Sequence, residues 1–125
     1  MGDIIMWRAE TASSGIPGRA LGRVRTNNFV VDDYAFPPYN GPGEEPGPAE
    51  LFLSGVTACA VLMLERIARV EGLPLEHVRA SMEAARDPDV QRPGPPTFDS
   101  ARLSFAFRGL TNEQAGQLVE TFKGR

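Results

Sequence analysis

The stretch of residues 51–64 constrains the fold more than any other part of this 125-residue chain. It is almost entirely apolar, and its apolar residues would cover the whole circumference of a helix. A helix that is apolar all round must be enclosed on all sides. A chain of this length has few elements with which to enclose it. We therefore expect a second copy of the chain to cover the helix, in a homodimer.

The limits of this helix are marked by capping signals. Residues 37–48 form a loop rich in proline and glycine, and Pro48 suits a first helical turn, where its missing N–H costs nothing. Glu50 is favourable at the positive end of the helix dipole. Gly72 and Pro74 predict the helix end. The apolar run is shorter than the about 20 residues of a membrane span, so we expect a core helix and no membrane anchor.

The remaining segments predict strands and one further helix. Residues 4–7 form a β-prone edge run, and residues 19–33 alternate loosely, with Arg23 and Arg25 on one face. Residues 75–86 have a helical composition but a strand-like alternation, which we follow. Residues 100–108 show the clearest alternation, and Thr111 with Gln114 forms a capping box before an amphipathic helix. This order predicts a single α+β domain over residues 1–125, with helices packed on a mostly antiparallel sheet.

Composition excludes several classes of function. The formal net charge is -3 and the basic residues are scattered, so we expect no nucleic-acid partner. The chain has one cysteine, Cys59, and one histidine, His77, which excludes an internal disulfide and a zinc site built from Cys and His alone. We expect no metal and no cofactor. No basic and apolar leader begins the chain, so we expect a cytoplasmic protein.

Residues 48–59, PAELFLSGVTAC, resemble the central-helix signature of the OsmC/Ohr family, the osmotically inducible protein C and organic hydroperoxide resistance proteins. Val31–Asp32, the following segments 66–68 and 72–75, and the order of elements are similar too. The resemblance implies an intertwined homodimer whose paired central helices lie between two sheets. It also implies a stress-response oxidoreductase, a thiol peroxidase that reduces organic hydroperoxides. Cys59 would be its catalytic thiolate, regenerated by an external thiol reductant.

An activating arginine is the second residue that this chemistry needs. Cys59 lies too deep in the helix to gain from the helix N-terminus, so a cation must come from elsewhere in the fold. The resemblance implies an arginine of the N-terminal strands held by a glutamate. We place Arg25 first for this catalytic role, with Arg23 and Arg19 as alternatives.

Two departures from the family pattern weaken the catalytic reading. The pattern has a glutamate where this chain has Ala49, and Glu50 lies half a turn round the helix from Cys59 and about 13 Å along it. The pattern also has a second cysteine after the last helix, so we expect a C-terminal truncation or an external resolving thiol.

The alternative is a non-catalytic OsmC-like dimer that binds a small apolar ligand, with Cys59 as an inert core thiol. Tyr34, Phe36 and Tyr39 border the loop before the central helix, where they line a pocket mouth or pack in a core or interface. We expect Trp7 to be a packing residue and His77 to be exposed.

Overall fold

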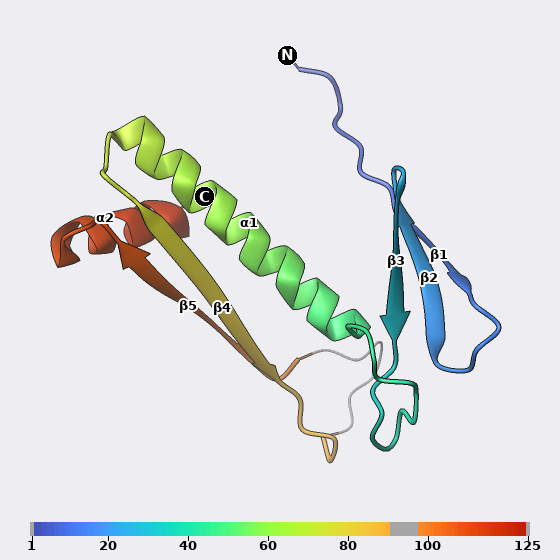
Figure 1. The fold of residues 1–125 in the computed structure, drawn as a ribbon. Coiled ribbons are helices and arrows are strands. Elements are labelled where there is room, and N and C mark those ends of the chain that lie inside the picture. The colour runs from blue at the N-terminus through green and yellow to red at the C-terminus, as the bar shows by residue number, and fades with distance from the viewer. Residues whose placement is uncertain (1, 91–97, 125) are drawn as a thin grey trace. The chain divides into compact units, whose positions relative to one another are not determined.

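The computed structural model describes residues 2–90 and 98–124, in which five strands and two helices follow one another (Figure 1). These elements are β1 (Glu10–Ser13), β2 (Arg19–Val24), β3 (Asn27–Asp32), α1 (Pro48–Glu71), β4 (His77–Ala85), β5 (Ser100–Arg108) and α2 (Asn112–Lys123). The chain divides into two compact units, Met1–Phe52 and Leu53–Arg125, with α1 continuing from the first into the second. The α+β class with antiparallel sheets is confirmed.

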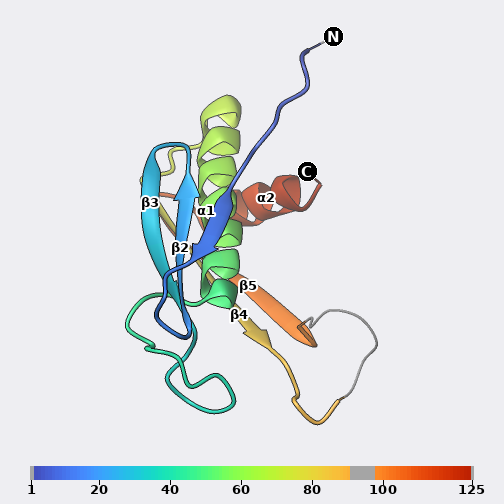
Figure 2. The same cartoon turned by 90° about the vertical axis from the view of Figure 1, so that its right-hand side faces the viewer.

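The first unit contains a three-stranded antiparallel sheet with β2 between β1 and β3 (Figure 2). Val24 pairs with Asn27, so the β2–β3 hairpin turns on two residues, Arg25 and Thr26. Arg25 takes a positive φ of 56°, which belongs to the turn and not to a strand. The prediction that Arg25 continues the strand face of Arg23 is therefore wrong.

The β-prone run at residues 4–7 is not a strand, and this prediction is also wrong. The segment before Glu10 has no regular structure, and the side chains of Ile4 and Trp7 are 88% and 83% exposed. Trp7 is thus not a packing residue within this chain. A β-branched or aromatic composition favours a strand only where a neighbouring strand offers a partner, and β2 already has β1 and β3 beside it.

The loop between β3 and α1 is folded back by backbone hydrogen bonds. The amide of Asp33 donates to the carbonyl of Gly18 at 2.8 Å, and that of Gly41 donates to the carbonyl of Tyr34 at 2.8 Å. Gly43 has a φ of +64°, where a side chain would be strained and would meet Ala35. The predicted loop and the predicted helix start are confirmed, since α1 begins at Pro48.

The second unit packs α1 and α2 against the antiparallel β4–β5 hairpin. Both strands have the predicted faces: Val78, Phe105 and Phe107 turn inward, while His77 and Arg79 are exposed. The capping box at Thr111 and Gln114 is confirmed, with both hydrogen bonds present at 3.2 and 3.0 Å. The core cluster joins three elements through Leu64, Ile67, Ala68, Val78 and Leu118. The proline-containing stretch of residues 87–96 predicts a loop after β4, and its residues 91–96 lie outside the described part of the chain.

Helix α1 ends at Glu71, followed by Gly72 with a φ of +68°, as predicted. Its buried residues form one stripe, Ala60, Leu64, Ile67 and Ala68. Phe52, Leu62 and Val70 are 60%, 62% and 80% exposed. The helix is long and apolar enough to cross a membrane, and 22% of its most apolar stretch is buried in the chain. One such helix is weak evidence of a span, because core helices meet the same criteria. Within one chain, an apolar face of α1 stays open.

Candidate functional site

Cys59 lies in the middle of α1 with its side chain exposed. Helical spacing puts Gly55, Ala58 and Leu62 on the same exposed side, while its neighbour Ala60 is 2% exposed. Two of these neighbours are small, so another molecule can approach the thiol closely. The thiol is thus not packed in the core of its own chain, and it is chemically accessible there. Among the described residues, no group of His, Cys, Asp and Glu side chains is arranged to hold a metal ion.

Glu50 lies in the first turn of α1 and does not approach Cys59. Its carboxylate accepts a hydrogen bond from the amide of Gly47 at 2.9 Å, which satisfies a backbone donor just before α1. Glu50 and Cys59 are nine helix positions apart, which places the two side chains on opposite sides of the helix about 13 Å apart along its axis. The interpretation of Glu50 as a helix-start charge is confirmed.

Arg19 forms a bidentate ion pair with Asp32. Its Nε donates to Oδ1 at 2.7 Å and its Nη2 donates to Oδ2 at 2.8 Å. The two residues lie directly opposite each other in the β2–β3 register. The Asp32 side chain is fully buried and that of Arg19 is 22% exposed. Two parallel charge-assisted hydrogen bonds fix the plane of the guanidinium as well as its position.

Asp32 also anchors the loop that leads into α1. Its Oδ2 accepts hydrogen bonds from the backbone amides of Glu44 and Glu45, each at 3.0 Å, and the Glu44 carboxylate accepts one from Arg19 at 3.2 Å. The hydrogen bond from Arg19, assisted by the two amides, holds the pKa of Asp32 well below its usual range despite burial. The same pairing raises the pKa of Arg19 above its ordinary value. We call Arg19, Asp32 and Glu44 the arginine clamp.

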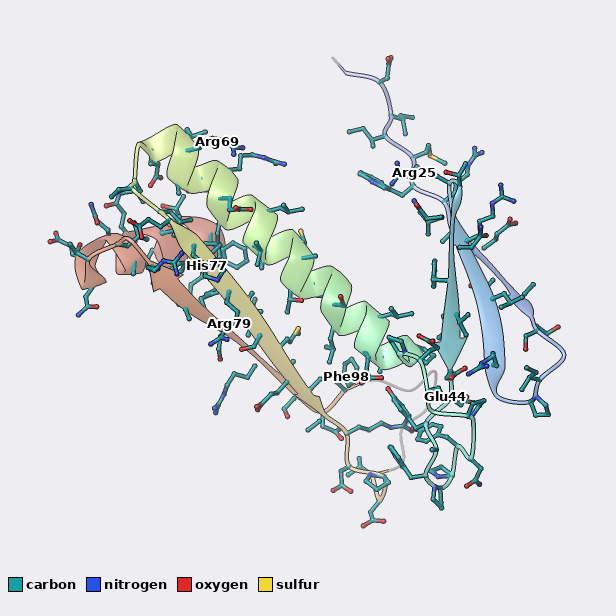
Figure 3. All side chains as sticks on the ribbon, in the orientation of Figure 1. Arg25, Glu44, Arg69, His77, Arg79 and Phe98 are labelled. Carbon is teal, nitrogen blue, oxygen red and sulfur yellow. The ribbon has the colours of Figure 1, made fainter. Side chains whose placement is uncertain are left out.

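The three candidate arginines are not brought together. Arg23 donates through Nε to the carbonyl of Arg25 at 2.9 Å, and both line an open hollow of about 620 Å³ with Trp7, Arg8, Ala9 and Glu10. Figure 3 shows Arg25 at the turn end of the hairpin and Glu44 near its other end. Arg19 begins β2 and Arg25 follows its end, six residues or about 20 Å of extended backbone further on. The two arginines therefore lie at opposite ends of the hairpin.

The loop before α1 carries an aromatic cluster of Tyr34, Phe36 and Tyr39. The ring of Tyr34 stacks on Phe36 at a centroid distance of 5.3 Å and meets Tyr39 edge-on at 5.2 Å. Phe36 and Tyr39 are 57% and 44% exposed, whereas burial raises the pKa of Tyr34, with a smaller contribution from the negative charge of Glu50. The cluster thus combines mutual packing with an apolar surface open to a ligand.

Sequence reasoning missed the pairing of Asp32 with Arg19, since it used Asp32 only as part of the Val31–Asp32 similarity to the family. Asp32 ends β3, and its carboxylate is also the centre of the arginine clamp. The available signal was its place across a hairpin from an arginine, and that pairing appears only once the turn at Arg25 and Thr26 sets the register.

Comparisons with known proteins agree with this fold. A family model described as OsmC-like protein matches residues 41–125, which include α1 and Cys59. An OsmC-like protein from Mycoplasma pneumoniae superposes with a TM-score of 0.80 at 12% identity, covering 97% of this chain and 82% of the other. An organic hydroperoxide resistance protein from Legionella pneumophila gives 0.70 at 20% identity, covering 97% and 84%. A search among curated proteins found no match.

Proposed function

Because the chain belongs to the OsmC-like protein family, we propose that it is a thiol-dependent peroxidase that reduces organic hydroperoxides in the cytoplasm. The observation that carries this proposal is Cys59, an exposed thiol in the middle of the helix that the family model matches. The Legionella relative, described as an organic hydroperoxide resistance protein, suggests the substrate class.

The proposed reaction has an oxidative half, in which the peroxide is reduced, and a reductive half, in which the cysteine is regenerated. The Cys59 thiolate attacks the outer oxygen of the hydroperoxide, the O–O bond breaks, and the departing alkoxide takes up a proton to leave as an alcohol. The sulfur is oxidised to a sulfenic acid. An external thiol then forms a mixed disulfide with Cys59 and releases water, and a second thiol frees the cysteine with formation of a disulfide. These 125 residues contain one cysteine, and we propose an external thiol as its reductant.

Departure of the oxygen requires a hydrogen-bond donor, for which the sequence favours Arg25 over Arg23 and Arg19. The role of Arg25 as this hydrogen-bond donor stays a prediction. Its side chain is exposed and its backbone lies in the hairpin turn, beside the hollow that it shares with Arg23. Arg19 has the more rigid setting, since two carboxylates hold its guanidinium.

We further propose that the active form is an intertwined homodimer. The exposed apolar face of α1, with Phe52, Leu62 and Val70, supports this, because burial of that face in a partner removes it from water. The apolar side chains of residues 4–7 are also exposed in a single chain. We propose that the partner chain covers them as well.

Replacement of the thiol tests the proposed activity. Cys59→Ser removes the nucleophile while nearly keeping the volume, so we expect no consumption of cumene hydroperoxide in the presence of a dithiol. Ala58→Ser, a change to serine at the neighbouring exposed helix position, is the matched control and should keep turnover. If Cys59→Ser consumes the hydroperoxide as fast as the wild type, Cys59 is not the nucleophile.

The aromatic cluster favours a second candidate, a non-catalytic dimer that binds a small apolar ligand. Two of its rings are substantially exposed beside the loop that enters α1, and Ala49 stands where the family pattern has its glutamate. This alternative predicts that an apolar fluorescent probe binds wild type and Cys59→Ser equally, that Phe36→Ala weakens this binding, and that neither protein consumes hydroperoxide.

A further inference from the structure

We propose that a hollow in the first unit binds a small organic phosphate, a monoester that carries a flat apolar ring. The hollow measures about 620 Å³ and is lined by Trp7, Arg8, Ala9, Glu10, Arg23 and Arg25. We call it the basic hollow. All of its residues belong to Met1–Phe52, so the site needs nothing from the second unit. The inference goes beyond the proposed peroxidase and does not depend on it.

The first argument is the uncompensated charge of the basic hollow. Its three arginines outnumber its one glutamate by two, and their side chains are exposed. Arg23 donates through Nε to the carbonyl of Arg25 at 2.9 Å. Among the residues that the structure describes, no carboxylate forms an ion pair with any of these three arginines. A ligand with two negative charges would balance the lining and receive charge-assisted hydrogen bonds.

The second argument is that the strand register concentrates the arginines. Glu10 lies opposite Arg23 in the antiparallel β1–β2 pairing, so the residues before Glu10 run toward the turn that carries Arg25. Continued by two residues, this register would bring Arg8 level with Arg25, but the pairing ends at Glu10. Like charges opposite each other destabilise a strand pair. An anion bound between Arg8 and Arg25 would remove that repulsion.

The third argument concerns the shape of the anion. Each guanidinium is a planar fork that matches the geometry of an oxyanion. The three forks come from three places: the segment before β1, the strand β2, and the hairpin turn. A phosphate monoester is close to doubly charged at neutral pH and presents three strong acceptor oxygens. A carboxylate has two oxygens and a single charge. The number of arginines and the net charge of the lining therefore favour a phosphate.

Trp7 gives the basic hollow an apolar wall. Its side chain is 83% exposed, so one face of the indole can meet a ligand while the other meets the partner chain. Flat rings pack on an aromatic side chain in offset or edge-on arrangements. The lining thus fits both ends of an aromatic phosphate ester, because the arginines suit its phosphate and the indole suits its ring.

Phenyl phosphate is the probe, and Trp7 reports its binding because it is the one tryptophan of the chain. Titration of the wild-type protein at constant ionic strength should give a saturable change in tryptophan fluorescence, with the same Kd by calorimetry. Benzenesulfonate has the same ring and three oxygens but one charge fewer, so we expect it to bind roughly tenfold more weakly. Inorganic phosphate, which lacks the ring, should also bind more weakly.

Three results of these titrations would overturn the proposal. Equal affinities for phenyl phosphate and benzenesulfonate would show that the protein does not select a doubly charged anion. Equal affinities for phenyl phosphate and inorganic phosphate would show that the ring is not recognised. No binding of any of the three would show that the basic hollow is not a site in the assembled protein.

Two substitutions should move the affinity for phenyl phosphate in opposite directions. Arg8→Gln removes one cation and should weaken binding roughly tenfold. Glu10→Gln removes the carboxylate of the basic hollow and should strengthen binding roughly threefold, an effect that loss of structure would not produce. Arg79→Gln, an equal change of charge at an exposed position of β4, is the control for Arg8→Gln and should keep the wild-type Kd. Equal Kd values for Arg8→Gln and Arg79→Gln would contradict the proposal.

Cys59→Ser separates this inference from the proposed function. This variant should bind phenyl phosphate with the affinity of the wild type, although we expect it to consume no hydroperoxide. Binding that disappears together with the thiol would contradict a site confined to the first unit. If the wild type binds phenyl phosphate but consumes no hydroperoxide, the peroxidase fails and the phosphate site stands.

Discussion

Asp32 and Arg19 face each other across the β2–β3 hairpin and are joined by two hydrogen bonds of 2.7 and 2.8 Å. This pairing, together with two backbone amides, holds the pKa of Asp32 well below the value of about 3.9 expected in the unfolded chain. A carboxylate whose folded pKa is depressed contributes stability above its unfolded pKa. That contribution is lost as the pH falls from about 4 through the lower folded value.

We therefore predict that wild type loses stability between about pH 5 and pH 2 and that Asp32→Asn flattens this loss. The variant should be less stable than wild type at neutral pH, because Asn cannot provide two charged acceptors to Arg19. Urea unfolding midpoints measured across this range provide the check. Asp33→Asn, at the next position, is the control and should keep the wild-type slope. If Asp32→Asn loses as much stability at low pH as wild type does, Asp32 is not the cause of the acid sensitivity.

The capping box of α2 gives a second prediction. Thr111 and Gln114 satisfy each other's backbone amides at 3.2 and 3.0 Å. Thr111→Ala leaves one helix-end amide without its acceptor and should lower the free energy of unfolding by about 1 kcal/mol. Asn112→Ala, one residue further on, is the control, with an expected change of less than about 0.5 kcal/mol. Denaturant titrations of both variants decide whether the cap contributes as the geometry indicates.

Local patterns predicted the parts of the fold that depend on neighbours in sequence. The alternation of residues 100–108 matches β5, and the Thr111–Gln114 box marks the start of α2, because each signal arises within a few residues. The run at residues 4–7 misled for the opposite reason. Its β-prone composition says nothing of whether a partner strand is present, and in this chain it has none among the described residues.

The candidate site was predictable only in part. Cys59 stands out from the sequence through its position in the helix signature, but the clamp of Arg19 and Asp32 joins residues 13 positions apart. Their pairing depends on a register that a two-residue turn sets, and a one-residue slip would have put Asp32 on the other face. The sequence placed Arg25 on a strand face, because arginine rarely takes a positive φ. Its φ of 56° puts it in the hairpin turn instead.

Two leucines of α1 give a third prediction, because they differ in burial within the same helix. Leu64 is 0% exposed in the core cluster, and Leu62 is 62% exposed. Leu64→Ala leaves a cavity and should cost about 2–5 kcal/mol of unfolding free energy at every protein concentration. Leu62→Ala should affect stability only through association, so that its effect shrinks as the protein is diluted. Thermal melts at two concentrations tell these cases apart. A concentration-independent loss for Leu62→Ala would place this residue in the core of its own chain.

The fourth prediction concerns the open face of α1, which has apolar side chains at Phe52, Leu62 and Val70. We expect sedimentation at micromolar concentration to give one species near twice 13.6 kDa. Leu62→Glu places a charge in the middle of this face, where it would have to be buried without a partner on association. This variant should sediment as a monomer.

The control is Ile16→Glu, an equal charge change at a residue that is 51% exposed in the turn before β2, where it should leave the dimer intact. A wild type that sediments as a stable monomer contradicts the dimer directly. A dimer that survives Leu62→Glu contradicts the role of this face and moves the interface elsewhere. Loss of peroxide turnover together with loss of the dimer, at an unchanged rate of Cys59 alkylation, would further indicate that the partner completes the substrate site without activating the thiol.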